Sequence, residues 1–180
     1  MKKIIEEKIE IPEGISCEYK NNLFICRKDS TELSRKINLP NIQLEIKGNS
    51  IVFNSLKSNK EERKIIFTHI KHIKNMFRGL NKKFIYQLES CNVHFPMVVK
   101  VNGDKLLINN FLGEKIPRTA KILPNVNVTV KGNLITVESA DREAAGQTAA
   151  NFEKATIVKG RDRRIFQDGI YITEKPEREE

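Results

Sequence analysis

The sequence has few cysteines and no long apolar run, and these two absences limit where the protein works. Its 180 residues include three cysteines, Cys17, Cys26 and Cys91, and no CxxC pair. An odd set without such a pair argues against a disulfide scaffold and is typical of a reducing compartment. No stretch approaches the ~20 apolar residues of a membrane span, and charge interrupts the N-terminus too early for a signal peptide. We therefore expect a soluble, cytoplasmic protein with no membrane partner.

The sequence also lacks the residue groupings that catalysis requires. Its nine glycines are scattered one per turn, so no phosphate-cradling loop is present. No Ser or Cys is marked as a nucleophile beside a His held by an acid, and the cysteines fit apolar strand patterns as buried structural residues. Asp29, Asp104, Asp141 and Asp162 each fit a turn or a helix cap. We expect no enzyme activity, no cofactor and no small-molecule substrate.

One arrangement imitates a metal site. His69-x-x-His72 and Cys91-x-x-His94 together supply four ligands of the type that zinc prefers. The histidines of the first pair lie one helical turn apart, whereas the second pair is expected in a strand that begins a second domain. Neither pair has the turn that is usual in structural zinc sites, so we expect no metal and interpret the histidines as surface residues.

Basic residues are in excess. There are 32 Lys and Arg against 23 Asp and Glu, which gives a formal net charge of +9. Such a surplus favours a polyanionic partner through the release of counterions, although charge alone does not identify that partner.

A repeat organises the chain. Residues Leu39–Ile51 match Leu123–Ile135 at a constant offset, beginning with Leu-Pro-Asn and sharing a Lys-Gly-Asn turn. Apolar residues alternate on both sides of that turn, which predicts a β-hairpin in each copy. Further alternating strands are expected upstream, over 16–19 and 23–27 in the first copy and over 98–101 and 105–108 in the second.

A helix is predicted after each hairpin. The first, about 60–80, opens with a capping box at Ser58-Asn59-Lys60-Glu61, and the second, about 141–155, with Ser139, Asp141 and Glu143. Each helix has one apolar face. The residues of these faces are Ile66, Ile70, Ile73, Met76 and Leu80 in the first helix, and Ala145, Ala149, Phe152 and Ala155 in the second.

These elements predict an α+β protein of two tandem duplicated domains, each an antiparallel β-sheet packed against one α-helix. A short polar linker, Asn81-Lys82-Lys83, marks the boundary between the two domains, so we expect domains at 1–82 and 83–180.

Two stretches are candidates for binding a polyanion. The first is a basic stripe on the first helix, within about 40° of one direction and opposite the apolar face. Its members are Lys60, Lys64, Lys71, Lys74, Arg78 and Lys82. A simple solvated helix face is the alternative interpretation.

The second candidate is the segment that follows the second helix. The paired N–H donors of its arginines match the oxygens of a phosphate group. Its glycine lets the backbone approach a ligand closely, and its aromatic rings can stack on a ligand or anchor the segment. A charged connecting loop is the alternative. The residues expected to bind RNA are Lys154, Lys159, Gly160, Arg161, Arg163, Arg164 and Tyr171.

Four segments resemble one known family. They are His94-Phe95-Pro96, the helix segment 69–79, Asn109-Asn110-Phe111-Leu112-Gly113-Glu114-Lys115, and the closing Arg163-Arg164-Ile165-Phe166-Gln167-Asp168-Gly169-Ile170-Tyr171. Together they resemble the sixth large-subunit ribosomal protein, in the archaeal and eukaryotic branch whose eukaryotic member is protein nine of the large subunit. The archaeal type fits better, because the longer eukaryotic extensions are missing.

The resemblance implies a structural constituent of the large ribosomal subunit, a monomer within it, beside neighbouring ribosomal proteins. It implies contact with large-subunit ribosomal RNA chiefly through the second domain, near the base of the lateral stalk and the factor-binding region. The bacterial branch uses a different basic motif here. The alternative is a basic protein-binding adaptor that uses a sheet edge or the first helix on an acidic partner.

Overall fold

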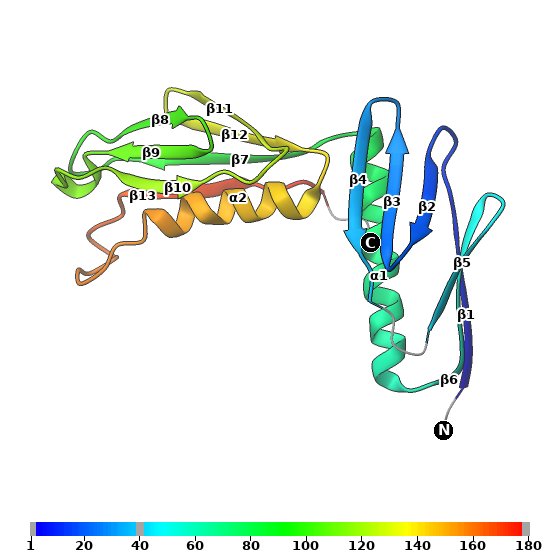
Figure 1. Ribbon diagram of the computed structural model, residues 1–180. Helices are drawn as coiled ribbons and strands as arrows, with labels where there is room; N and C mark the ends of the chain where they lie inside the picture. Colours follow the sequence, from blue (N-terminus) through cyan, green and yellow to red (C-terminus); the bar gives the residue numbers. More distant parts are fainter. Residues whose placement is uncertain (1–2, 39–41, 178–180) are drawn as a thin grey trace. The chain divides into compact units, whose positions relative to one another are not determined.

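The chain divides into two compact units, which are described separately. In the computed structural model, unit 1 is Met1–Lys82 and unit 2 is Lys83–Glu180, and the residues described are 3–38 and 42–177 (Figure 1). The Leu-Pro-Asn start of the first repeat, Leu39-Pro40-Asn41, lies outside the described residues, as does Arg178-Glu179-Glu180. Every strand pairing in the described residues is antiparallel and each unit carries one α-helix, so the predicted α+β class is confirmed.

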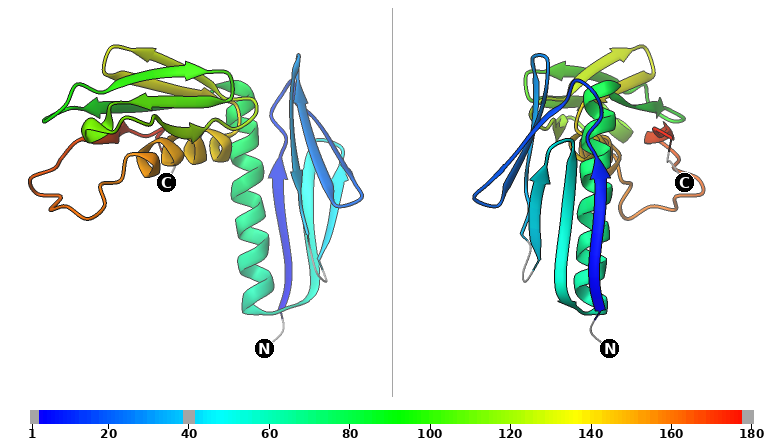
Figure 2. Two further views of the ribbon diagram at one scale, coloured as in Figure 1. Left: turned by 60° about the vertical axis from the view of Figure 1, so that its left-hand side comes forward. Right: turned by 90° about the vertical axis from the view of Figure 1, so that its right-hand side faces the viewer.

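Unit 1 contains two small sheets and one long helix. Its elements are β1 (Lys3–Glu10), β2 (Ser16–Lys20), β3 (Leu23–Lys28), β4 (Thr31–Lys36), β5 (Gln43–Lys47), β6 (Ser50–Ser58) and α1 (Lys60–Asn81). The sheet orders are β1-β6-β5 and β2-β3-β4. Figure 2 shows α1 running along the strands of this unit. The apolar side chains of strands and helix meet in one core.

Unit 2 repeats this plan and adds one strand. Its elements are β7 (Phe84–Cys91), β8 (Val98–Asn102), β9 (Lys105–Asn109), the 3₁₀ turn η1 (Phe111–Gly113), β10 (Arg118–Lys121), β11 (Asn127–Lys131), β12 (Leu134–Ser139), α2 (Arg142–Ala155) and β13 (Gly169–Glu174). The sheet orders are β11-β12-β7-β13 and β10-β9-β8. Strand for strand, β7 to β12 follow the pairing of β1 to β6.

The structure differs from the predicted single sheet per domain. In each unit the hairpin and the first strand form one sheet, while the three upstream strands form a second. Local alternation identifies strands but does not say which strands share hydrogen bonds, so the split into two sheets was not visible in the sequence.

The two copies differ at their connections. A two-residue turn, Asp29-Ser30, joins β3 to β4, whereas the equivalent β9–β10 connection is the longer stretch 110–117 that contains η1. A second long connection, 156–168, joins α2 to β13, a strand with no counterpart in the described part of unit 1. Figure 1 shows both connections at the same end of unit 2, beside the β7–β8 connection. The copies therefore diverge most at one end of unit 2.

The observed first turns of α1 and α2 differ from the predicted N-caps in two details. The N-cap of α1 is Asn59 and not Ser58: the Asn59 N–H donates to Glu62 Oε2 at 2.7 Å, which places the capping box one residue later. Ser58 is still part of β6. At α2 the Asp141 side chain accepts the Glu143 N–H at 2.9 Å and is the cap. Ser139 instead donates to the Asn125 carbonyl, which ties the second copy's Leu-Pro-Asn turn to the helix start.

The apolar face of α1 is also shifted. Ile66, Ile70 and Ile73 are buried as predicted, but the next core residue is Phe77, while Met76 and Leu80 are only half-buried. The buried face is therefore centred on Ile66, Ile70, Ile73 and Phe77, and Met76 and Leu80 pack at its edge.

In α2, small residues let the helix lie close to its sheet, as predicted. Ala145, Ala149 and Phe152 are fully buried. A Cβ atom added at Gly146 would lie 2.9 Å from the Tyr86 hydroxyl on β7, so side chains at this position conflict with the close approach.

The cysteines are less uniformly buried than expected. Cys26 is buried, whereas Cys17 and Cys91 are half-buried. Cys17 and Cys26 are directly opposite on β2 and β3, with their Sγ atoms 3.2 Å apart. The hydrogen bond with Cys17 and burial together raise the pKa of the Cys26 thiol, which stays protonated at neutral pH.

Candidate nucleic-acid interface

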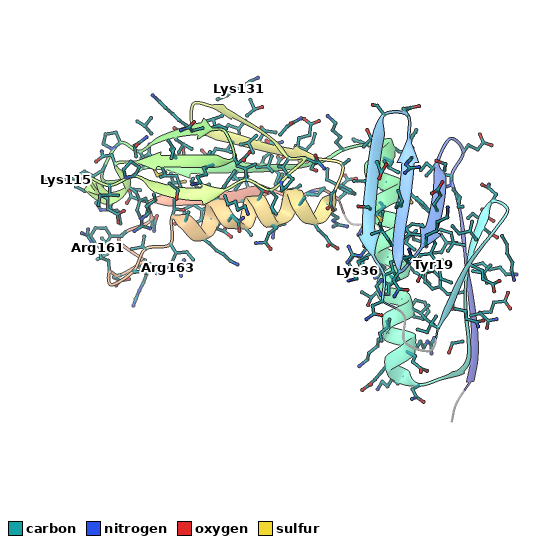
Figure 3. All side chains as sticks on the ribbon, in the orientation of Figure 1. Tyr19, Lys36, Lys115, Lys131, Arg161 and Arg163 are labelled. Atoms are coloured by element: carbon teal, nitrogen blue, oxygen red, sulfur yellow. The ribbon has the colours of Figure 1, made fainter. Side chains whose placement is uncertain are left out.

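The arginine-rich segment is an exposed loop between α2 and β13. Lys159, Gly160, Arg161, Arg163 and Arg164 are all exposed in it. Figure 3 shows Arg161 and Arg163 at the free end of this loop. Lys154 is exposed on the last turn of α2, and Tyr171 is exposed on β13. The structure therefore brings the predicted residues onto one continuous stretch of chain at the surface.

The loop has little acid to neutralise its cations. Asp162 is its one exposed carboxylate, and it accepts the Arg164 N–H at 2.9 Å, so it caps a turn within the loop. The Arg164 side chain is 92% exposed and its Nε lies 3.5 Å from Asp162 Oδ1, a weak contact in water. Gly160 has φ +69° with no atom near a built Cβ, so glycine is required by the turn and not by crowding.

Asp168 anchors the far end of the loop. Its side chain is 4% exposed, and Oδ1 accepts the N–H groups of Val93 at 2.8 Å and His94 at 3.0 Å. Oδ2 lies 2.6 Å from His94 Nδ1. Burial by itself raises the pKa of the Asp168 carboxyl, but the hydrogen bonds from His94 and Val93 outweigh it and hold the pKa below its ordinary value. A buried carboxylate thus joins the loop to the β7–β8 connection.

Arg118 anchors the near end. Its guanidinium binds Glu114 with two hydrogen bonds of 2.8 and 2.6 Å, and this interaction lowers the pKa of Glu114. It lies 4.2 Å from the centre of the Phe111 ring, and Nη1 donates to the carbonyls of Ala155 at 2.9 Å and Ile157 at 3.3 Å. The Asn-Phe-Leu-Gly-Glu-Lys segment therefore holds the end of α2 and the start of the loop.

Replacement of Arg118 by Lys should loosen the start of the loop. Lysine keeps the charge but cannot make the two-pronged contact with Glu114 while also donating to both carbonyls. We expect a loss of about 1–2 kcal/mol in unfolding free energy and faster amide exchange over 156–168, measured by hydrogen-exchange mass spectrometry. Arg164→Lys, at an exposed position of the same loop, is the matched control, and equal exchange in both variants would contradict the anchoring role.

Aromatic rings stabilise the loop from inside. The Phe166 ring stacks on His94 with centroids 4.7 Å apart, and the Arg161 guanidinium lies 4.7 Å from the same ring's centre. The Tyr171 hydroxyl donates to the Gln167 carbonyl at 3.1 Å, and its ring folds back over Gly169. Tyr171 is therefore first of all an anchor of the β13 start, with an exposed ring face.

The four residues of zinc-ligand type, His69, His72, Cys91 and His94, do not form a metal site in the described residues. His69 and His72 lie on α1 with ring centroids 6.3 Å apart, and burial lowers the pKa of His69. Cys91 ends β7, while His94 lies beyond that strand and not in it, with its ring bound to Asp168. Over residues 3–38 and 42–177, no group of three or more His, Cys, Asp or Glu side chains is placed to hold a metal ion.

The basic stripe lies on the surface of α1. Lys60, Lys64, Lys71, Lys74 and Lys82 are exposed, and Arg78 is half-buried. Because Phe77 joins Ile66, Ile70 and Ile73 in the core, the stripe is about 120° from the centre of the buried face, on a flank of the helix and not directly opposite it.

Lys82 is the residue that follows the helix, with extended backbone. From Arg63 to Lys83 the sequence contains no Asp or Glu. Neither helix in the described part of the chain is long and apolar enough to cross a membrane.

Sequence reasoning missed the residues that hold the loop in place. Asp168 and Glu114 were noted only within segments that resemble the family, His94 was weighed only as a metal ligand, and Arg118 was not singled out. The contacts of Asp168 with Val93 and His94 span 75 and 74 positions in sequence, so no local pattern reports them. An Arg and a Glu four residues apart were a usable signal for the Glu114–Arg118 pair.

An anchored loop rich in exposed cations, carried on a duplicated α+β scaffold, is a feature typical of proteins that bind polyanions. The family model for Ribosomal protein L6 matches residues 95–169. The chain is 42% identical to large ribosomal subunit protein uL6 of Methanococcus vannielii over 96% of this chain and 94% of that protein. It is 43% identical to the uL6 of Methanobrevibacter smithii, over 95% of this chain and 96% of that one.

A third relative is the uL6 of Methanosarcina mazei, 42% identical over 97% of this chain and 99% of that protein. The chain therefore belongs to the uL6 family of large ribosomal subunit proteins, in agreement with the predicted resemblance. It is accordingly a structural constituent of the large subunit in the cytoplasm and not an enzyme.

Proposed function

We propose that this chain binds large-subunit ribosomal RNA through unit 2, with the loop 156–168 as the main contact. The observation that supports this most is a loop whose exposed cations are fixed at both ends by buried or half-buried anchors, Arg118 and Asp168. A loop backbone that is already held at both ends loses less conformational entropy when its cations bind phosphate. The contacting residues proposed are Lys154, Lys159, Gly160, Arg161, Arg163, Arg164 and Tyr171.

We also propose where in the large subunit the chain lies and what lies beside it. As the family resemblance implies, the chain sits as a monomer near the base of the lateral stalk and the factor-binding region, beside neighbouring ribosomal proteins. Filter binding of the whole chain to large-subunit and small-subunit ribosomal RNA over a range of KCl concentrations tests the RNA contact. Preferential binding of the large-subunit RNA with a steep salt dependence is expected, and equal or absent binding would contradict it.

The stripe on α1 is proposed as a secondary contact with RNA phosphates. The absence of acid from Arg63 to Lys83 supports this, because an ordinary solvated face usually mixes both signs. Replacing Lys64 and Lys71 by Ala should leave the unfolding free energy within about 0.5 kcal/mol, since both side chains are exposed. The same change should flatten the salt dependence by about one to two counterions, and an unchanged slope would show that the stripe does not contact RNA.

The alternative, an adaptor for an acidic protein through a sheet edge or α1, differs in what co-purifies. Sedimentation of the chain with large subunits at moderate salt supports the RNA role. A discrete complex with an acidic protein, free of RNA, would support the adaptor.

A further inference from the structure

Three connections of unit 2 form one surface. Asp168 in the α2–β13 connection binds the backbone of Val93 and His94 in the β7–β8 connection. Asn110 in the β9–β10 connection donates to the Pro96 carbonyl at 2.9 Å, and a Cβ built on Gly113 would lie 3.6 Å from the Phe95 ring. We call residues 92–97, 110–117 and 156–168 the loop surface. Figure 3 shows Lys115 and Arg161 at this end of unit 2.

Large apolar side chains are exposed on the loop surface. Ile116 is 81% exposed, Val93 64%, Ile165 61% and Phe95 43%. Neighbouring exposed apolar residues on a folded domain usually mark a binding site, because water contact with them is unfavourable. Phosphate binding needs only cations, so these side chains call for a ligand that also has apolar faces.

The loop surface also carries exposed cations, and these favour a nucleic-acid ligand over a protein. Lys115, Lys159, Arg161, Arg163 and Arg164 are exposed there, while Glu114 is engaged by Arg118 and Asp162 by the Arg164 backbone. The centres of protein–protein interfaces are depleted in charge, which disfavours a protein partner. A nucleotide combines a phosphate with a flat base whose faces stack on Phe, His or Arg.

The stack beneath the surface fits a base as well. His94, Phe166 and Arg161 form one stack. The His94 ring centroid and the Arg161 Cζ atom each lie 4.7 Å from the centroid of the Phe166 ring. His94 is held in orientation by Asp168, and its side chain is 31% exposed. In a duplex the base faces are covered by their neighbours, so a surface of this kind can contact only nucleotides outside a helix.

We propose that the loop surface binds unpaired RNA nucleotides, with bases against Phe95, Ile116, Ile165 and the His94–Phe166–Arg161 stack, and with phosphates on Lys115, Arg163 and Arg164. This rests on the proposed RNA-binding function and deepens it, because it names single-stranded nucleotides as the class of ligand. It also assigns the β7–β8 and β9–β10 connections to the interface.

The test separates apolar from electrostatic contacts. The probe is large-subunit ribosomal RNA transcribed from the Methanobrevibacter smithii sequence, and the proteins are the full-length wild type and the double variant Phe95→Leu with Ile116→Thr. Loss of one base–aromatic contact should weaken binding roughly tenfold, while the slope of log affinity against log salt stays unchanged because no charge is lost. Both side chains are exposed, so circular dichroism should show an unaltered fold.

Ile85→Thr is the matched control, because Ile85 is 43% exposed near the start of β7, away from the loop surface. It should bind within twofold of wild type. Dimethyl sulfate modification of the same RNA should show that nucleotides protected by the wild type and not by the double variant are unpaired in free RNA.

Wild-type affinity of the double variant, or protection confined to paired nucleotides, would overturn the proposal. If at the same time Arg161→Ala, Arg163→Ala and Arg164→Ala together weaken binding, the RNA-binding function stands and this inference alone fails. If the wild type does not bind the RNA, both fail.

Discussion

Replacement of Asp168 by Ala is expected to lower the free energy of unfolding of unit 2 by about 3 kcal/mol. The carboxylate is buried and accepts three hydrogen bonds, from the Val93 N–H, the His94 N–H and the His94 ring. Alanine leaves these donors without their acceptor and opens a small cavity. Hydrogen-exchange mass spectrometry resolves the loss, because peptides from 83–180 should exchange faster while those of unit 1 do not.

The conservative variant provides the control. In Asp168→Asn, one amide oxygen can still accept both backbone N–H groups, and the amide NH₂ can donate to a neutral His94 ring. Most of the stability should therefore return, with a deficit of about 1 kcal/mol or less. An Asp168→Ala variant as stable as wild type would contradict the anchoring role of this residue.

The same residue predicts a pH dependence. The pKa of Asp168 is lower in the folded state than its ordinary value, so its stabilisation is fully present above the pKa of the unfolded chain, about 3.9. The stabilisation is lost as the pH falls through the folded-state pKa. The stability difference between wild type and Asp168→Ala should therefore shrink below about pH 4, and a difference that grows on acidification would refute the assignment.

Simultaneous replacement of Arg161, Arg163 and Arg164 by Ala is expected to weaken binding to large-subunit ribosomal RNA on the order of a hundredfold at 0.15 M salt. Each arginine that contacts a phosphate releases close to one counterion, so the slope of log affinity against log salt should fall by up to about two to three. The three side chains are exposed, so their removal should leave the fold intact, with a loss of about 0.5–1 kcal/mol from the contact between Arg161 and the Phe166 ring.

The control for this variant removes the same charge elsewhere in unit 2. Lys100, Lys105 and Lys121 are exposed on β8, β9 and β10, outside the loop surface. Their replacement by Ala changes the net charge equally, so a general loss of electrostatic attraction would affect both triple variants. A similar loss of affinity in the two would show that the arginine loop is not a specific contact.

Much of the fold follows from local patterns in the sequence. The helix bounds differ from the structure by one residue, 60–81 against about 60–80 and 142–155 against about 141–155, because caps and apolar periodicity define helices locally. The Lys-Gly-Asn turns were found for the same reason: Gly48 and Gly132 both take positive φ. Asn21 and Asn22 also take positive φ, as the two-residue turn between β2 and β3 requires.

The parts that could not be predicted depend on contacts between distant segments. Which strands share a sheet, and that β13 pairs with β7, are decided by packing in three dimensions. Phe77 is buried in the core, while Met76 and Leu80 pack half-buried against it, a difference that the local spacing does not report.

The candidate site divides in the same way. The cations of the loop are visible as composition, whereas the anchors Asp168 and Arg118 acquire their roles only from partners brought close by folding.

The duplication is asymmetric in a way that bears on function. Unit 1 keeps the compact plan, with the two-residue turn Asp29-Ser30 where unit 2 has the connection 110–117. Unit 2 adds that connection and the loop 156–168, which lie at the same end of the unit, and β13, which follows the loop. In this family member the second copy thus carries the elaborated surface on a scaffold that both copies share.

The loop surface of unit 2 is proposed to contact large-subunit ribosomal RNA. A hydroxyl-radical footprint of that RNA, with the wild type and with the triple arginine variant at saturating protein, tests it most directly. We predict a discrete set of protected nucleotides in the wild type that loses its protection in the variant. Absence of protection by the wild type, or an identical footprint with both proteins, would contradict the claim.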